Sequence, residues 1–162
     1  MPAAKITGEL PIDSPDRRRL PLLLRRAWYG LNQAFRRRLA TLGVTPDQFT
    51  VMRTLLENEG ITQRELAQLM ASDPNTVASL LERMEKAGLV DRQTHEQDRR
   101  AHRIRLKPSG KRKYEAARAT AVALQTDILT ALPEARREEF LEHLARVADA
   151  CRIVAEKSPK QN

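Results

Sequence analysis

Cysteine is almost absent from the 162-residue sequence, which contains Cys151 alone. A single thiol excludes an intrachain disulfide framework and any zinc site that needs several thiolates, and it suits a reducing compartment. The three histidines, His95, His102 and His143, are scattered, and none has a second ligand at the spacing of a metal site on a helix. We therefore expect neither a structural metal nor a cofactor.

Long apolar runs are also missing, and so are the short motifs of common enzymes. No run approaches the roughly 20 apolar residues that a membrane-spanning helix needs, and the N-terminal segment lacks the apolar stretch of a signal peptide. The chain has no glycine-rich phosphate loop and no plausible arrangement of serine, histidine and aspartate. These absences predict a cytoplasmic protein that is not an enzyme and has no membrane partner.

What the sequence has in excess is positive charge, with a formal net charge of +8. Residues 1–46 hold nine basic and three acidic side chains, and residues 92–113 hold nine and two, whereas the segments 47–91 and 114–162 are slightly acidic. Positive charge confined to parts of a chain indicates an anionic partner. That partner is commonly nucleic acid, although an anionic ligand or a membrane surface gives the same signal.

The beginning of the chain predicts an arm followed by one long helix. Residues 1–19 mix proline, glycine and charged residues without apolar periodicity, which is typical of a flexible basic arm. From Pro21 to a stop near Gly43, apolar residues recur at steps of three and four, as on one face of an amphipathic helix. They are Leu24, Ala27, Trp28, Leu31, Phe35, Leu39 and Leu42.

Three short helices are predicted next, each by its own start signal. The segments Thr45–Gln48 and Thr62–Glu65 have the residue types and spacing of capping boxes. Asp73 can cap a third helix that runs to about Ala87, with Gly88 as its left-handed end. Three such helices, the last two joined by a tight turn, outline a helix-turn-helix.

The third short helix has two different faces at 100° per residue. The apolar face, which must be core, holds Val77, Leu80, Leu81 and Met84. The opposite face is polar and holds Asn75, Ser79, Glu82 and Lys86, flanked by Thr76 and Arg83. Small hydrogen-bonding side chains on the first turn suit the major groove of DNA, where they reach base edges, but a solvated face would accept them equally well.

A β-hairpin is predicted directly after this helix, followed by two more helices. In "LVDRQT" and "AHRIRL" apolar or β-branched residues alternate with polar ones, on either side of the polar segment "HEQDRR". The pattern then becomes helical from about Pro108 to Thr130, and Pro133 and Glu134 open a last helix. Both terminal helices carry more apolar surface than a small domain covers by itself, which predicts pairing with a second copy of the chain.

Together these elements resemble the MarR family of bacterial transcriptional regulators. The resemblance lies in "VTPDQFTVMRTL", "ITQRELAQLMASDPNTVASLLERMEKAGLVDR" and "DRRAHRIRLKPSG", and it is clearest from Val44 to Gly110. It implies a mainly α fold with a small β-hairpin wing, in which a winged helix-turn-helix is flanked by N- and C-terminal dimerisation helices. The expected divisions are a DNA-binding domain at 44–107, a dimerisation region at 20–43 and 108–157, and a tail at 158–162.

The resemblance also implies where DNA is contacted. In this family the recognition helix enters the major groove, and a basic residue at the hairpin tip, two after an aspartate, enters the minor groove. Asp98 and Arg100 match that pattern, and the carboxylate can hold the guanidinium in a fixed pose. The predicted contacts with double-stranded DNA are Asn75, Thr76, Ser79, Arg83, Lys86, Asp98, Arg99 and Arg100.

Two departures from the family pattern affect these predictions. Many members have Thr-Arg where this chain has Ala78-Ser79, so base readout is expected to depend more on the first turn and on the wing. The usual Leu-Thr after the second wing strand is Leu106-Lys107 here, which adds a phosphate contact. Arg99 is expected to contact phosphate, whereas the returning strand's Arg103 and Arg105 belong partly to a solvated face.

Family members usually act as homodimers on pseudo-palindromic operators, most often as repressors that a small molecule releases. The resemblance places the pocket between the first helix, the second helix and the base of the fifth. The predicted effector contacts are Arg25, Arg26, Trp28 and Tyr29, and the effector is expected to be an aromatic carboxylate or its coenzyme A thioester. The alternative interpretation of Trp28 is a core anchor, and this is the interpretation that we favour from the sequence.

Two alternatives remain at this point. An architectural DNA-binding protein without an effector would bind with a steep salt dependence and little sequence preference. Redox sensing through Cys151 is the other, but the peroxide-sensing branch of the family has its reactive cysteine near the first helix, where this chain has none. Because Cys151 lies on an apolar stripe, we expect a buried structural thiol.

Overall fold

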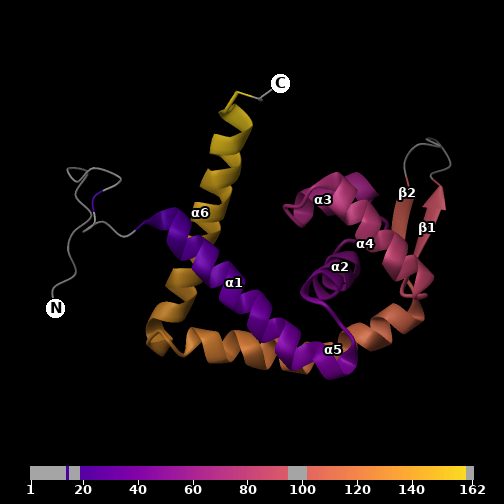
Figure 1. The fold of residues 1–162 in the computed structure, drawn as a ribbon, viewed down its shortest axis with the longest axis horizontal. Coiled ribbons are helices and arrows are strands. Elements are labelled where there is room, and N and C mark those ends of the chain that lie inside the picture. The colour runs from indigo at the N-terminus through magenta and orange to yellow at the C-terminus, as the bar shows by residue number, and fades with distance from the viewer. Residues whose placement is uncertain (1–13, 15–18, 95–101, 160–162) are drawn as a thin grey trace. The chain divides into compact units, whose positions relative to one another are not determined.

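Helices make up most of the computed structural model, which describes Ser14, residues 19–94 and residues 102–159. The described part of the chain is mainly α with one antiparallel hairpin, as the sequence predicts (Figure 1). The elements are α1 (Leu20–Leu39), α2 (Pro46–Glu57), α3 (Gln63–Leu69), α4 (Pro74–Lys86), β1 (Val90–Thr94), β2 (His102–Leu106), α5 (Pro108–Leu129) and α6 (Arg137–Lys157), with 3-10 turns at Ala40–Leu42 and Glu134–Arg136.

The two predicted capping boxes are confirmed. The hydroxyl of Thr45 accepts a hydrogen bond from the amide of Gln48 at 3.2 Å, and the Gln48 side chain accepts one from the amide of Thr45 at 3.1 Å. Thr62 and Glu65 make the same reciprocal pair at the start of α3, at 3.2 and 2.7 Å. These bonds satisfy amides that the first turn of a helix leaves without partners. Both capping boxes predicted from the sequence therefore form the reciprocal hydrogen bonds that define such a box.

Left-handed residues end the helices where the chain must turn. Gly43 has φ of 59° after α1 and its 3-10 turn, and Gly88 has φ of 72° after α4. Ala71, between α3 and α4, also has a positive φ of 49°, which is uncommon for a residue with a Cβ. The last helix differs from the prediction, because a 3-10 turn at Glu134–Arg136 follows Pro133 and α6 begins only at Arg137.

The chain divides into two compact units, residues 1–121 and 122–162, and α5 runs from the first into the second. The core of the first unit forms around α4, whose predicted apolar face is buried as expected: Val77, Leu80, Leu81 and Met84. Residues of α2 and α3 belong to the same core, among them Val51, Met52, Leu55 and Leu66. Burial of this apolar face holds α4 with its polar face outward.

Aromatic rings join three helices of the first unit. The ring centroids of Phe35 and Phe49 are 5.2 Å apart, and those of Phe49 and Tyr114 are 5.1 Å apart. The three residues come from α1, α2 and α5. At these separations the rings attract one another beyond the burial of their surface, by about 0.5–1.5 kcal/mol per pair. The pairs fix the N-terminal part of α5 against the core on which α4 also packs.

The hairpin is closed by strand pairing and by a backbone bond at its base, and one further backbone bond attaches it to the segment before α3. Val90 of β1 pairs with Leu106 of β2, and the amide of Ile104 donates a hydrogen bond of 3.0 Å to the carbonyl of Ile61, ahead of α3. At the base, the amide of Lys107 donates to the carbonyl of Leu89 at 2.9 Å. Figure 1 shows the hairpin beside α4. These bonds make the hairpin the wing of a winged helix-turn-helix.

Two predictions about the terminal helices are wrong for the single chain. Trp28 is not a core anchor, because its side chain is 63% exposed and Leu39 is the buried residue of α1. Cys151 is exposed, and no residue of α6 is buried. The apolar stripes on these helices are real, but the chain that carries them does not cover them. No described helix combines the length and the apolar character needed to span a membrane.

Candidate DNA-binding interface

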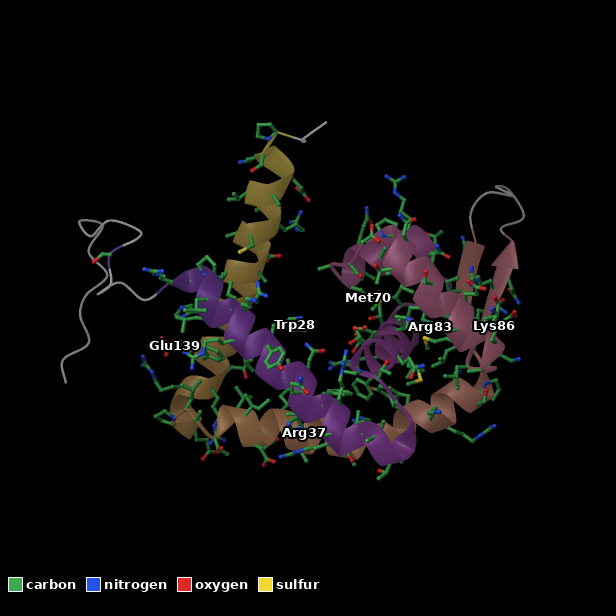
Figure 2. The ribbon with its side chains drawn as sticks, viewed as in Figure 1. Trp28, Arg37, Met70, Arg83, Lys86 and Glu139 are labelled. Carbon is green, nitrogen blue, oxygen red and sulfur yellow. The ribbon has the colours of Figure 1, made fainter. Side chains whose placement is uncertain are left out.

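The polar face of α4 is the first component of the candidate interface. Asp73 caps this helix, since its carboxylate accepts hydrogen bonds from the amide of Thr76 at 2.9 Å and from the Thr76 hydroxyl at 3.1 Å. Burial of the opposite face turns a row of polar side chains to solvent. The exposed residues are Asn75, Thr76, Ser79, Glu82, Arg83 and Lys86, of which Figure 2 labels Arg83 and Lys86.

The two cations on this face have different surroundings. Lys86 forms an ion pair with Glu82 one turn earlier, with 2.8 Å between the ammonium and the carboxylate. The hydrogen bond and the charge of Lys86 lower the pKa of Glu82, and the charge of Arg92 lowers it further. No described acidic side chain pairs with Arg83. Arg83 can therefore meet a phosphate directly, whereas Lys86 must exchange one anionic partner for another.

The wing strands are the second component, and they hold two side chains whose surroundings sequence reasoning missed. Arg92 of β1 lies 3.2 Å from the Glu85 carboxylate of α4. The side chain of Arg103 of β2 lies beside the turn before α3. A Cβ added to Gly60 in that turn would be 3.4 Å from a guanidinium nitrogen of Arg103. Hydrogen bonds from Thr62 lower the pKa of Glu65, and the charge of Arg103 adds to this effect. The alternation of polar and apolar residues along the strands gave a signal for the hairpin but not for these pairs.

The base of the wing is closely packed against the end of α4. The hydroxyl of Ser109 donates a hydrogen bond to the carbonyl of Gly88. At Gly110 a Cβ would collide with the carbonyl of Leu89 and with the side chain of Leu106, so only glycine fits the first turn of α5 without a shift. This close approach fixes the point at which the wing leaves the helix-turn-helix.

The predicted wing-tip contacts Asp98, Arg99 and Arg100 lie outside the described residues. Their proposed roles at the minor groove and at phosphate therefore stay predictions. Of the two returning arginines, both Arg103 and Arg105 are exposed. Arg105 lies opposite Asp91 in the strand register of the hairpin.

The predicted effector contacts lie together on one stretch of α1. Arg25, Arg26, Trp28 and Tyr29 are all exposed, and residues three and four apart are neighbours on a helix surface. Trp28 projects from the middle of α1 in Figure 2. The Tyr29 hydroxyl accepts a hydrogen bond of 3.0 Å from the Gln33 side chain. Two guanidinium groups and two aromatic rings thus share a short surface.

Among the described residues, no cluster of histidine, cysteine and carboxylate side chains could hold a metal ion.

Comparison with known proteins places these features in a family. The MarR family model matches residues 44–102, which include α2, α3, α4 and β1. The HTH-type transcriptional repressor MdtR of Bacillus subtilis is 30% identical over 120 residues, covering 74% of this chain and 75% of that protein.

Solved structures give the same result. The transcriptional repressor CouR, bound to a 23-mer DNA duplex, superposes with a TM-score of 0.73 at 29% identity, over 80% of this chain and 92% of that one. CouR from Rhodococcus jostii RHA1 bound to p-coumaroyl-CoA superposes with a TM-score of 0.70 at 25% identity, over 80% and 91% of the two chains. The fold and the exposed face of α4 define a winged helix-turn-helix protein of the DNA-binding class. The chain belongs to the MarR family of transcriptional regulators.

Proposed function

We propose that this protein is a sequence-specific homodimeric repressor that acts in the cytoplasm and is released from its operator by a small molecule. The observation that carries the proposal is the exposed polar face of α4, whose opposite face is buried in the core. A helix with this orientation can enter the major groove, about 12 Å wide, without disturbing its own packing. The similarity to CouR, which has been solved on DNA, supports this use of the fold.

The side chains of α4 suit two kinds of DNA contact. Asn75, Thr76 and Ser79 are short hydrogen-bonding groups on its first turns, where a recognition helix meets base edges. Arg83 and Lys86 lie toward its C-terminal end and suit phosphates. The wing residues Asp98, Arg99 and Arg100 are assigned the minor groove and the adjoining backbone by family resemblance. Two copies of the chain would then read the two halves of a pseudo-palindromic operator.

Dimer formation is proposed from the apolar surface of the helices outside the winged domain. Leu22, Leu23 and Leu31 of α1 are exposed, as are Val122 and Ile128 of α5. On α6 the exposed apolar residues are Phe140, Leu144, Ile153 and Val154. Exposed apolar surface on several helices marks association, and a second copy is the most common partner. Sedimentation of the purified chain should give twice the monomer mass, and a monomer at micromolar concentration would contradict this part of the proposal.

The effector is proposed to be an aromatic carboxylate or its coenzyme A thioester. Trp28 and Tyr29 offer rings for stacking, and Arg25 and Arg26 offer charge for a carboxylate or phosphate. The complex of CouR with p-coumaroyl-CoA supports this class of ligand. A ligand that binds the protein better off the operator than on it lowers DNA affinity by linkage. The same coupling would weaken ligand binding in the DNA complex.

Competition between specific and random DNA tests the DNA-binding part of the proposal. Sequences are first selected by the protein from a random pool, and their affinity is compared with that of scrambled duplexes at fixed salt. A specific regulator should favour its site by a factor of about 10³ or more. Equal binding to both would instead indicate an architectural protein. Arg100→Ala should weaken operator binding and leave the dimer folded, and unchanged affinity would remove Arg100 from the interface.

A thermal-shift screen tests the effector. Aromatic acids and their coenzyme A thioesters are added to the protein, and a ligand that binds the folded state raises its melting temperature. Hits should also release the operator duplex in a fluorescence anisotropy assay. Trp28→Ala should reduce both effects, with Leu69→Ala as a control that changes an exposed apolar residue of α3, outside the surfaces proposed for DNA, effector and dimer. Hits that stabilise Trp28→Ala as much as the unchanged protein would show that Trp28 does not contact the ligand.

A further inference from the structure

Arg92 occupies a position in the wing where the strand pattern calls for an apolar side chain. In the antiparallel register Arg92 lies directly opposite Ile104, and paired residues project from the same face of a hairpin. Ile104 is fully buried, and Val90, two residues before Arg92 on the same face, is 1% exposed. The Arg92 side chain is accordingly only 22% exposed. A guanidinium therefore projects inward from the wing, on the face that packs against the core.

The partner of this inward charge is a carboxylate of the recognition helix. The Nε atom of Arg92 lies 3.2 Å from Oε2 of Glu85, in the last turn of α4. This Nε is buried and makes no hydrogen bond among the described residues, so its contact with Glu85 is an ion pair without hydrogen-bond geometry. Glu82, one turn earlier on α4, also lies within the field of Arg92. The ion pair thus joins the middle of β1 to the helix that carries the polar face.

The pair completes a set of attachments along both edges of the wing. The base is held by the bonds of Ser109 to Gly88 and of Lys107 to Leu89. The β2 edge is held by the bond from Ile104 to the carbonyl of Ile61. Beyond the base, the β1 edge contacts α4, and there the ion pair of Arg92 and Glu85 links two defined side chains. Apolar packing alone would not fix the angle between β1 and α4, because the hydrophobic effect is not directional.

A partly buried ion pair contributes little net stability. An apolar side chain of similar volume commonly replaces one without loss, whereas removal of one partner leaves a charge without compensation. We propose that Arg92 is a positioning residue for DNA binding: through Glu85 it fixes the wing relative to the recognition helix, so that both contact one duplex at the same time. This inference rests on the proposed function, since it concerns how the two reading elements are placed.

Glu85→Gln is the decisive variant because two mechanisms predict opposite results for it. If the charge of Glu85 acts only at long range, removing an acid beside DNA should tighten binding. If Glu85 positions the wing through Arg92, operator binding should weaken by about tenfold, the order of loss for one specific contact at such an interface. The melting temperature should fall somewhat, because the partly buried charge of Arg92 loses its partner, so affinity is measured at a temperature where the variant is fully folded.

Arg92→Met tests the other partner and has a matched control. Methionine retains apolar bulk at the inward position, so the fold should persist while operator affinity falls to a similar extent. Arg53→Met removes the same charge from a second ion pair, which lies within α2, is 2.9 Å long and is exposed. This control should bind the operator within about twofold of the unchanged protein, since an exposed pair contributes little.

The charge-swapped double variant Glu85→Arg with Arg92→Glu supplies the rescue. It restores an attractive pair with reversed polarity, so it should recover most of the affinity that either single change loses. The probe is the duplex that the unchanged protein selects from random DNA, with affinity measured at two salt concentrations and stability measured by thermal unfolding. Unchanged or tighter binding by folded Glu85→Gln would overturn the inference. If the unchanged protein selects no sequence, it is the proposed function that fails.

Discussion

Leu66 and Leu69 of α3 offer a test of the core in which the same substitution is made twice on one helix. Leu66 is fully buried and Leu69 is 59% exposed. Burying a leucine side chain completely contributes about 1.5–3 kcal/mol, and replacing it by alanine also leaves a cavity, so Leu66→Ala should cost about 2–5 kcal/mol. Leu69 buries roughly two fifths of its surface, so Leu69→Ala should cost about 0.6–1.2 kcal/mol by the same proportion.

The assay is urea unfolding followed by circular dichroism, with both variants at one protomer concentration because association shifts apparent stability. In thermal unfolding the same difference should appear as about 2–4 °C for each kcal/mol in a chain of this size. Helix propensity cancels, since both changes replace leucine by alanine within α3. Equal losses of stability, or a larger loss at Leu69, would refute the assignment of Leu66 to the core of the helix-turn-helix.

Three further predictions concern the caps and the base of the wing. Hydrogen bonds from Thr62 lower the pKa of Glu65 in the folded state from 4.5, so the stability that this carboxylate contributes should be lost as the pH falls below about 4.5. Glu65→Gln should therefore be less stable than the unchanged protein near neutral pH, and this difference should vanish in acid titrations of unfolding. Gly110→Ala should lower the melting temperature, since its Cβ would collide with the carbonyl of Leu89. Asp73→Ala should cost about 1 kcal/mol in urea unfolding, and Asp73→Asn should restore most of it. A pH-independent deficit, an unchanged melting temperature, or equal losses for the two Asp73 variants would each contradict the corresponding prediction.

Local signals made the helix-turn-helix predictable from sequence. The capping residues Thr45, Thr62 and Asp73 act on amides only three residues away, so the chemistry that starts each helix is contained within a few letters. The left-handed end at Gly88 is equally local. The apolar face of α4 was predictable for a related reason, since its period places four residues on one side whatever the neighbours are.

Burial of the terminal helices was not predictable in this way. The spacing that places Trp28 and Cys151 on apolar stripes is real, yet both are exposed in the single chain. Periodicity shows which side of a helix avoids water, but it does not identify the surface that covers it. A stripe covered by the same chain and one covered by a second copy have the same sequence pattern. The oligomeric state therefore decides what these residues contact.

Contacts between elements were also beyond the sequence pattern. The pattern of "LVDRQT" predicts no partner for Arg92, and the register opposite Ile104 shows that it projects inward. Its partner Glu85 lies seven residues earlier on a different element. Arg103 reads as a solvated strand residue, yet its charge acts on Glu65 at the start of α3. Each pair depends on how the hairpin packs, which the residues near it in sequence do not specify.

These pairs change how the excess positive charge near α4 should be understood. Lys86 forms an ion pair with Glu82, and Arg92 forms one with Glu85, so a count of basic residues overstates the charge available to phosphate. Exposed pairs such as that of Lys86 are worth little in water, so a phosphate can displace them, but each displacement returns part of the electrostatic gain. Such an arrangement weakens binding to any duplex equally. It leaves base contacts, which differ between sequences, with a larger share of the total affinity, as a sequence-specific regulator requires.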